Sequence, residues 1–334
     1  MGCKIENISY YLPKNILSNA DCARQYEKFS EDKIARKVGI EQRHIASENE
    51  FTSDLAVAAA EKIFSAGACK REEIDFLILC TQNPDYKLPT TACLVQEELK
   101  LKKEIGAFDI NLGCSGFVYA LGVAKGMITA GMAKKVLLIM SEIYSKLIHP
   151  KDYSVRTIFG DGAAAILVEE SQEEQIGQFV FGTDGSGAKE LIVPAGGCRF
   201  PISSETKQIM VDESGSRTKE NLYMDGPNVF LFSVDIIEDM YHKLMKKYQY
   251  SLEDIDLIVP HQANKYILDY ARKKLKIPTE KIYVNMKNVG NTVSASIPIA
   301  LKMAEEEGRL KKGDKVMLLG FGVGYSWAGT IITY

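Results

Sequence analysis

The stretch EIDFLI at residues 73–78 recurs as DIDLIV at residues 254–259, about 180 positions further along the chain. A second pair, KVLLI at 135–139 and KVMLL at 315–319, recurs in the same order at nearly the same spacing. Buried parallel strands are all rich in Val, Ile and Leu, so one such pair would be weak support for a repeat. Two pairs in one order indicate that the chain contains the same motif twice.

Strands and helices alternate around these segments, which predicts an α/β protein. Residues 76–80 form an apolar run typical of a buried strand, and residues 91–99 have the pattern of a helix. We predict two halves, residues 1–172 and residues 173–334. A chain duplicated in this way buries both sheets against shared helices, and a site at the seam can draw side chains from each half.

The composition argues against several kinds of function. Among the 334 residues, 46% are apolar, and Lys+Arg 41 against Asp+Glu 44 gives a net charge of -3, so no basic field exists to hold nucleic acid. No apolar run approaches the roughly 20 residues that span a bilayer. The N-terminus MGCKIE lacks a signal-peptide core, so we expect a cytoplasmic protein without a membrane segment.

Metal and cofactor signatures are missing from the sequence. The seven cysteines form no CxxC pair and adjoin no histidine cluster, so we expect neither a disulfide framework nor a zinc site. No GxxxxGK[ST] fingerprint occurs, and we expect no bound cofactor. Isolated cysteines are usually small buried hydrophobes, so a catalytic one must be identified by its surroundings.

Cys114 is the cysteine whose surroundings point to chemistry. The strand-like residues 108–113 precede it and an apolar helix follows, so it lies at a strand-to-helix turn, as in nucleophile elbows. Gly113 and Gly116 permit the tight backbone there. The start of the helix favours a thiolate, which predicts a lowered pKa for the Cys114 thiol. The alternative is a small residue packed beneath a glycine-rich turn.

His261 and Asn291 lie at the ends of predicted strands and loops in the second half. His261 follows the strand-like residues 255–260, at the position where open α/β sheets bind ligands, although a single histidine is more often structural. Asn291 lies in the loop NVGNTVSASIP at 288–298, a pattern that alone predicts a turn or helix cap. The segment GFGVGYS at 320–326 offers backbone N–H groups for an oxyanion hole.

Together these segments resemble the β-ketoacyl-acyl-carrier-protein synthase III family. The motifs are NLGCSGF at 111–117, VPHQAN at 259–264, NVGNT at 288–292 and GFGVG at 320–324, with GIEQR at 39–43 and FGDGAAA at 159–165 extending the match over nearly the whole chain. The resemblance implies a thiolase-like fold of the α/β class, with a duplicated five-layer αβαβα architecture, assembled as a homodimer.

The resemblance also implies a catalytic triad of Cys114, His261 and Asn291. Cys114 attacks an acyl thioester, and the backbone N–H groups of Cys114 and Val323 hold the oxyanion. His261 and Asn291 then donate hydrogen bonds to a malonyl thioester on acyl carrier protein, and the enolate formed by loss of CO₂ attacks the acyl-cysteine, in fatty-acid or related biosynthesis. We expect His261 to be neutral because the apolar strand end before it depresses its pKa.

Substrate recognition is implied at several further positions. The residues expected at the acyl pocket are Leu88, Gly226, Phe230 and Phe321, and Leu88 is expected to reach across the dimer. Lys273 and Lys274 stand where the family docks its acidic carrier protein, although a solvated helix face explains two lysines equally well.

Three positions depart from the family pattern at the coenzyme A site. Lys33 stands where a tryptophan is usual, and Tyr153 and Tyr266 stand where arginines are usual. Lysine provides neither a stacking plane nor a guanidinium fork, so we expect weakened coenzyme A binding. The priming donor is then a carrier-protein thioester or another unusual acyl thioester.

Two other functions stay open. A starter-unit acyltransferase or specialised ketosynthase of secondary metabolism or surface-glycan assembly would keep the acyl-cysteine and change the acceptor. A noncatalytic partner subunit would only shape a pocket, and the presence of Cys114, His261 and Asn291 argues against it. Thiolases and hydroxymethylglutaryl-type synthases need a second Cys or a catalytic Glu, for which the sequence has no convincing counterpart motif.

Overall fold

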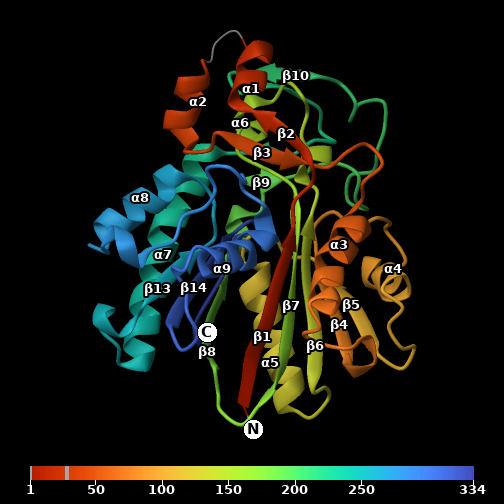
Figure 1. Ribbon diagram of the computed structural model, residues 1–334. Coiled ribbons are helices and arrows are strands. Elements are labelled where there is room, and N and C mark those ends of the chain that lie inside the picture. The colour runs from red at the N-terminus through yellow and green to blue at the C-terminus, as the bar shows by residue number, and fades with distance from the viewer. Residues whose placement is uncertain (1, 27–29) are drawn as a thin grey trace.

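The first sheet of the molecule is built from the N-terminal half of the chain (Figure 1). The structure is a computed structural model that describes residues 2–26 and 30–334. The strand order is β1-β7-β6-β4-β5, where β4 is parallel to β5 and β6, and β7 is antiparallel to β6 and β1. The bounds are β1 Gly2–Tyr11, β4 Phe76–Cys80, β5 Gly106–Ile110, β6 Lys135–Glu142 and β7 Gly162–Ser171.

The second sheet repeats this arrangement in the C-terminal half. Its order is β13-β14-β15-β8, with β13 parallel to β14, and β15 antiparallel to β14 and β8. A parallel bridge between Ile258 and Ile282 extends the sheet beyond β13, at the place that β5 takes beside β4. The bounds are β8 Ile176–Thr183, β13 Leu257–Pro260, β14 Lys315–Gly322 and β15 Ser326–Thr333.

The repeated sequence segments lie in equivalent strands with the same register. Phe76 pairs with Val136 between β4 and β6, and Leu257 pairs with Val316 between β13 and β14. The duplicated architecture predicted from the sequence is therefore confirmed. The division between residues 172 and 173 falls in the connection from β7 to β8, and as a domain boundary it stays a prediction.

Each copy of the motif also begins with the same side-chain contact. The Asp75 carboxylate accepts the backbone N–H of Lys135 at 3.0 Å, and the Asp256 carboxylate accepts that of Lys315 at 2.8 Å.

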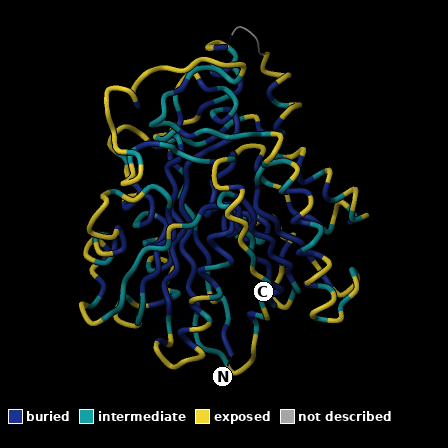
Figure 2. The backbone as a smooth tube through the Cα atoms, turned by 180° about the vertical axis from the view of Figure 1, so that it is seen from behind, coloured by how far each residue is buried: buried dark blue, intermediate teal, exposed yellow. Residues whose placement is uncertain are grey.

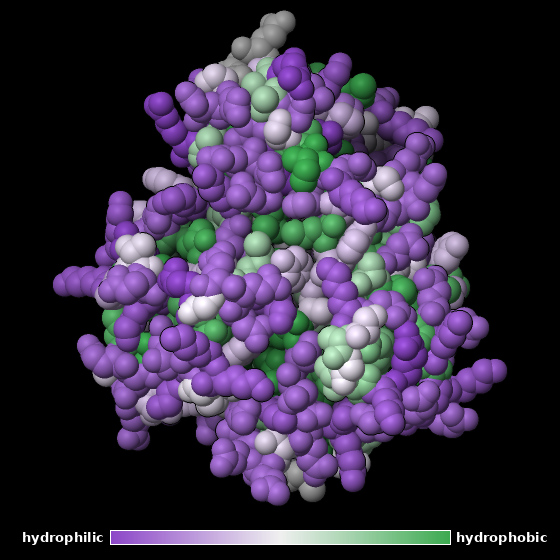
Figure 3. Space-filling view, viewed as in Figure 1, coloured by the Kyte–Doolittle hydropathy of each residue, from purple (hydrophilic) through white to green (hydrophobic). Residues whose placement is uncertain are grey.

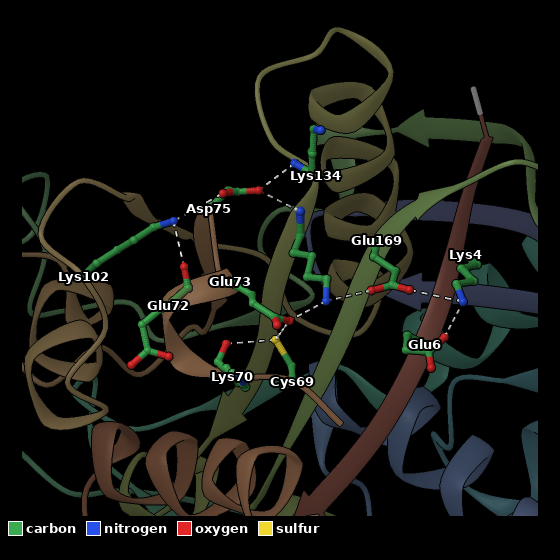
Figure 4. Close-up of polar contacts among 11 residues, drawn as sticks. Lys4, Glu6, Cys69, Lys70, Glu72, Glu73, Asp75, Lys102, Lys134 and Glu169 are labelled. Atoms are coloured by element: carbon green, nitrogen blue, oxygen red, sulfur yellow. Dashed lines mark hydrogen bonds and ion pairs between the residues drawn. The ribbon is translucent and has the colours of Figure 1, made fainter. Parts of the chain in front are cut away.

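In the first half, Lys4 and Lys135 both form ion pairs with Glu169, at 3.2 and 3.4 Å, so charges at this end of the sheet are paired across β1, β6 and β7 (Figure 4).

Helices cover both faces of both sheets and produce five layers. α3 and α4 cover the outer face of the first sheet, α5 and α9 lie between the sheets, and α7 covers the outer face of the second, with α8 packed on α7 (Figure 1). Because both faces of each sheet are covered, the central strands are continuous apolar runs, and Figure 2 shows them as the buried interior. The bounds are α3 Thr52–Ser65, α4 Thr91–Glu98, α5 Gly116–Thr129, α7 Gly226–Tyr248, α8 Lys265–Lys274 and α9 Ser296–Glu306.

Short elements form a further region at one end of the sheets (Figure 1). They are α1 Asn19–Gln25, α2 Glu31–Val38, α6 Tyr153–Arg156, β2 Asn15–Ser18, β3 Gln42–Ile45, β9 Leu191–Ile192, β10 Met210–Asp212, β11 Gly215–Arg217 and β12 Tyr223–Met224. Hydrophilic side chains predominate on the face shown in Figure 3. Across the described residues, no helix combines the length and apolar character needed to cross a membrane.

Candidate active site

One cavity of about 760 Å³ contains all three side chains of the predicted triad. Cys114 comes from the first half of the chain, and His261 and Asn291 come from the second. Their side chains are nearly buried, with exposed fractions of 5%, 2% and 4% for the three residues. The site therefore lies between the two halves of the chain, as the duplicated sequence led us to expect.

Cys114 lies in the turn between β5 and α5, directly before the helix N-cap Ser115. Gly322, the last residue of β14, lies against it: a Cβ at that position would be 2.6 Å from the Cys114 Cβ. The backbone of Val323 forms a hydrogen bond with the Cys114 sulfur, so the N–H predicted for the oxyanion hole lies beside the predicted nucleophile.

The prediction of a lowered pKa for Cys114 is wrong in its direction. Burial raises the pKa of the Cys114 thiol to about 12, and the nearby Glu142 carboxylate adds to the rise. The hydrogen bond from Val323 lowers the pKa of the thiol but does not offset burial. The sulfur is therefore a thiol in the resting site, and an attack by it would require a base to take its proton.

His261 follows the last residue of β13, and its backbone N–H donates to the Leu319 carbonyl at 2.8 Å. Its Nδ1 lies 2.7 Å from the Ser296 Oγ, and its ring meets Phe321 edge-on with centroids 5.6 Å apart. Burial lowers the pKa of His261 to about 3, so the imidazole is neutral at physiological pH. This confirms the predicted direction, with burial as the cause.

The Asn291 amide is fixed in orientation by its neighbours. Its Oδ1 accepts the Val293 N–H at 2.9 Å, and its Nδ2 donates to the Ala263 carbonyl at 3.3 Å. The same Nδ2 lies 3.4 Å from the His261 Nε2. Val293 has φ +53°, a left-handed backbone that is strained for a β-branched residue and that is typical of functional sites.

The other predicted site residues divide into two groups. Gly226, Phe230 and Phe321 line the cavity with the triad. Leu88 lies apart from it in the loop after β4, with 84% of its surface exposed. Lys273 is exposed on α8, whereas Lys274 forms an ion pair with Glu238 of α7 at 2.7 Å, so its charge is already compensated.

The mouth of the cavity has a mixed aromatic and basic lining. Tyr153 and Tyr266, the two positions that depart from the family's arginines, both line it, as do Arg36 and Lys37 of α2. The Tyr266 ring is exposed and packs against Phe230 with centroids 5.3 Å apart. Tyr266 of α8 therefore presents an aromatic ring at a position where the family usually has an arginine.

Glu142 is a residue beside the site that the sequence analysis did not identify. It ends β6, is completely buried, and accepts hydrogen bonds from the Ser294 hydroxyl at 2.7 Å and the Gln82 backbone N–H at 3.1 Å. Burial raises the pKa of this carboxyl to about 8. The signal available in the sequence was a glutamate two residues after the apolar run at 136–140.

The fold and the cavity place this chain among the thiolase-fold condensing enzymes, a class of acyltransferases. Models described as 3-oxoacyl-[acyl-carrier-protein] synthase III and its C-terminal region match residues 108–185 and 245–334. The β-ketoacyl-[acyl-carrier-protein] synthase III of Caldanaerobacter subterraneus subsp. tengcongensis is 39% identical over 326 residues, covering 97% of this chain and 95% of that protein. The chain belongs to the 3-oxoacyl-[acyl-carrier-protein] synthase III family.

Solved structures agree with this assignment. A crystal structure of a 3-oxoacyl-(acyl-carrier-protein) synthase III is 46% identical, with a TM-score of 0.98 and full coverage of both chains. The β-ketoacyl-[acyl carrier protein] synthase III from Thermus thermophilus is 38% identical, with a TM-score of 0.88, covering 100% of this chain and 99% of that one. The thiolase-like five-layer fold predicted from the sequence is thus confirmed.

Proposed function

We propose that this chain condenses an acyl primer, held as a thioester on Cys114, with a malonyl unit on acyl carrier protein. The proposal rests on one observation: Cys114, His261 and Asn291 all line the same cavity. The products are a 3-oxoacyl thioester and CO₂, in fatty-acid or related biosynthesis. These three side chains supply every reacting group, so the proposed reaction uses no cofactor.

The first half-reaction transfers the acyl group to sulfur. The Cys114 thiol gives its proton to the neutral His261, and the sulfur attacks the donor thioester carbonyl. Backbone N–H groups of Cys114 and Val323 hold the oxyanion, and the departing thiolate of the donor takes the proton. A base is needed here because burial keeps the sulfur protonated.

The second half-reaction uses Asn291 and the Nε2–H tautomer of His261 as hydrogen-bond donors, with the His261 Nδ1 then accepting from the Ser296 hydroxyl. Nδ2 of Asn291 and Nε2 of His261 are 3.4 Å apart, a spacing that lets both groups address one thioester oxygen. When CO₂ leaves the malonyl group, the negative charge moves to that oxygen, and the two donors stabilise it. The carbanion then attacks the acyl-cysteine carbonyl and expels the Cys114 sulfur as a thiolate, which takes a proton from solvent to restore the resting thiol.

Intact-protein mass spectrometry with a panel of acyl thioesters tests this proposal. We expect one acyl adduct on the wild-type chain and none on Cys114→Ala, and a 3-oxoacyl product after addition of malonyl carrier protein. His261→Ala and Asn291→Ala should each lower condensation by about 10²–10³. Condensation that persists in Cys114→Ala would contradict the proposal, and acyl transfer without malonyl decarboxylation would favour a starter-unit acyltransferase.

The priming donor follows from the cavity mouth. Tyr153 and Tyr266 cannot hold phosphates as arginines do, so we propose that the primer arrives on a carrier protein rather than on coenzyme A. The acidic carrier would meet Lys273 of α8 together with Arg36 and Lys37 at the mouth. A higher kcat/KM for an acyl carrier-protein primer than for the matching coenzyme A thioester is the expected result, and Lys273→Glu should raise KM for the carrier substrate.

The homodimer and the cytoplasmic location are also part of the proposal. β5 is an edge strand of half-buried residues, which is the kind of strand that a second copy can pair with. Tyr86 and Leu88, in the loop after β4, have 60% and 84% of their surfaces exposed. A partner subunit would cover both side chains and bring Leu88 toward the neighbouring acyl pocket.

A further inference from the structure

Glu142 connects the half of the chain that carries the nucleophile to the loop that carries Asn291. It ends β6 in the first sheet, and its Oε1 lies 2.7 Å from the Ser294 Oγ. Ser294 belongs to the turn η6, Val293–Ala295, and lies three residues after Asn291 within the same loop of the second half. The carboxyl Oε2 accepts the N–H of Gln82, at 3.1 Å, from the loop after β4. The contact to Ser294 is entirely buried and bridges the seam at the level of the active site.

Four described residues that interact electrostatically with Glu142 carry negative charge or none. They are Asp161 directly before β7, Cys80 of β4, Cys114 itself, and Tyr144 just after β6. Burial and Asp161 raise the pKa of the Glu142 carboxyl to about 8. In the protonated form, the acid O–H can donate to the Ser294 Oγ, so this bond survives in either protonation state.

We propose that Glu142 is a positioning residue that acts in its uncharged form, holding the Asn291 loop against the first half while keeping negative charge away from Cys114. The inference rests on the proposed condensation. It assigns a role to a buried acid that neither half-reaction consumes, and it predicts different effects on the two half-reactions.

The contact with Ser294 matters because the Asn291 loop is strained. Asn291 accepts the N–H of Val293, whose backbone is left-handed at φ +53°, and Ser294 is the next residue. A strained segment persists only where its surroundings determine its position. Without the hydrogen bond between Ser294 and Glu142, the Asn291 amide would no longer be held in its position. A displacement of about 1 Å in a catalytic group costs on the order of 10² in rate.

The uncharged state matters because Cys114 develops negative charge. A Glu142 carboxylate raises the pKa of Cys114, so ionisation of Glu142 opposes activation of the thiol. Acylation of a cysteine ordinarily becomes faster as the pH rises. Here we expect the opposite above neutrality: the rate declines around pH 8, where Glu142 loses its proton.

Substitutions at position 142 separate the two roles. Glu142→Ala should lower condensation by about 10² while Cys114 acylation changes only a few-fold, and Ser294→Ala should reproduce this split. Glu142→Gln keeps both hydrogen bonds without an ionisable group, so it should restore most of the condensation and remove the alkaline decline. Glu169→Gln, in the ion pairs at the opposite end of the first sheet, is the matched control and should behave as wild type in both half-reactions.

Three results would overturn the proposal. They are a Glu142→Gln variant as impaired as Glu142→Ala, an alkaline decline that persists in Glu142→Gln, and an equal loss of acylation and condensation in Glu142→Ala. If Glu142→Ala does not fold, the pH profile of Glu142→Gln decides the question. A wild-type chain that forms no acyl-cysteine would refute the proposed function itself, and this outcome is distinct from the other three.

Discussion

Cys114 and His261 are both uncharged at neutral pH, because each is almost completely buried and a buried ion is poorly solvated. This pair differs from a preformed thiolate and imidazolium, in which the proton has already moved. An uncharged pair keeps the imidazole available as a base for the thiol and later as an N–H donor to the malonyl carbonyl. Proton transfer is then a step of the reaction rather than a property of the resting site.

The pH dependence of condensation follows from His261. Burial lowers its pKa from 6.5 to about 3, so as the pH falls through 6.5 the imidazole stays neutral and the rate should not change through this group. The profile of kcat/KM measured below neutrality, with an exposed histidine variant such as His242→Gln as control, checks this. A rate that rises as the imidazole protonates would contradict a neutral donor.

At single positions, the sequence predicted site residues that lie next to recognisable motifs. The structure brings the predicted Cys114, His261 and Asn291 into one cavity, and their catalytic roles stay predictions. Glu142 was missed because its partner Ser294 is 152 residues away in the chain. The direction of the Cys114 pKa was wrong because a sequence shows the start of a helix but not the depth of burial.

Among the elements, strands were predicted better than their ends. The apolar run at 76–80 is β4 in full, and the helix predicted at 91–99 is α4. The strand predicted at 108–113 is β5 at Gly106–Ile110, and it ends where its partner β4 ends, since Ile110 pairs with Cys80, the last residue of β4. The length of a strand is set in this way by a distant partner, which leaves no local signal in the sequence.

The end of β14 has little space for side chains. A Cβ on Gly322 would be 2.8 Å from the Cys114 sulfur, closer than real contacts allow, so Gly322→Ala must displace the nucleophile. We expect acylation to fall by about 10² with a small change in melting temperature. Gly185→Ala, where the added Cβ would meet nothing within 4 Å, is the control for stopped-flow acylation. Full activity of Gly322→Ala would show that the site tolerates a shifted sulfur.

At the scale of the whole molecule, the two sheets share their middle layer. α5 contacts strands of both sheets, and α9, from the second half, covers β1 and β7 of the first. A fragment of residues 1–172 would therefore lack α9 and expose the face of α5 that meets β14. We expect this fragment to show no cooperative thermal transition by circular dichroism, whereas the full chain does. A folded fragment would mean that the halves are independent domains.

The proposed dimer can be tested at Leu88. Burial of a leucine contributes about 1.5–3 kcal/mol, so Leu88→Asp should weaken dimerisation at least tenfold in sedimentation equilibrium. Met132→Asp is the control, since Met132 is also exposed, at 66%, in the turn after α5. Equal effects of the two substitutions would place the partner elsewhere.

The protonated sulfur of Cys114 has a consequence for inhibition and for oxidative damage. Hydrogen peroxide and alkylating electrophiles react with thiolates, and with a pKa of about 12 almost none of this sulfur is ionised at neutral pH. The unoccupied enzyme should therefore withstand oxidants that inactivate enzymes with acidic cysteines. Compounds chosen for electrophilic reactivity alone should be slow inhibitors, whereas a molecule that first fills the cavity and engages His261 would promote the proton transfer that its own attachment requires.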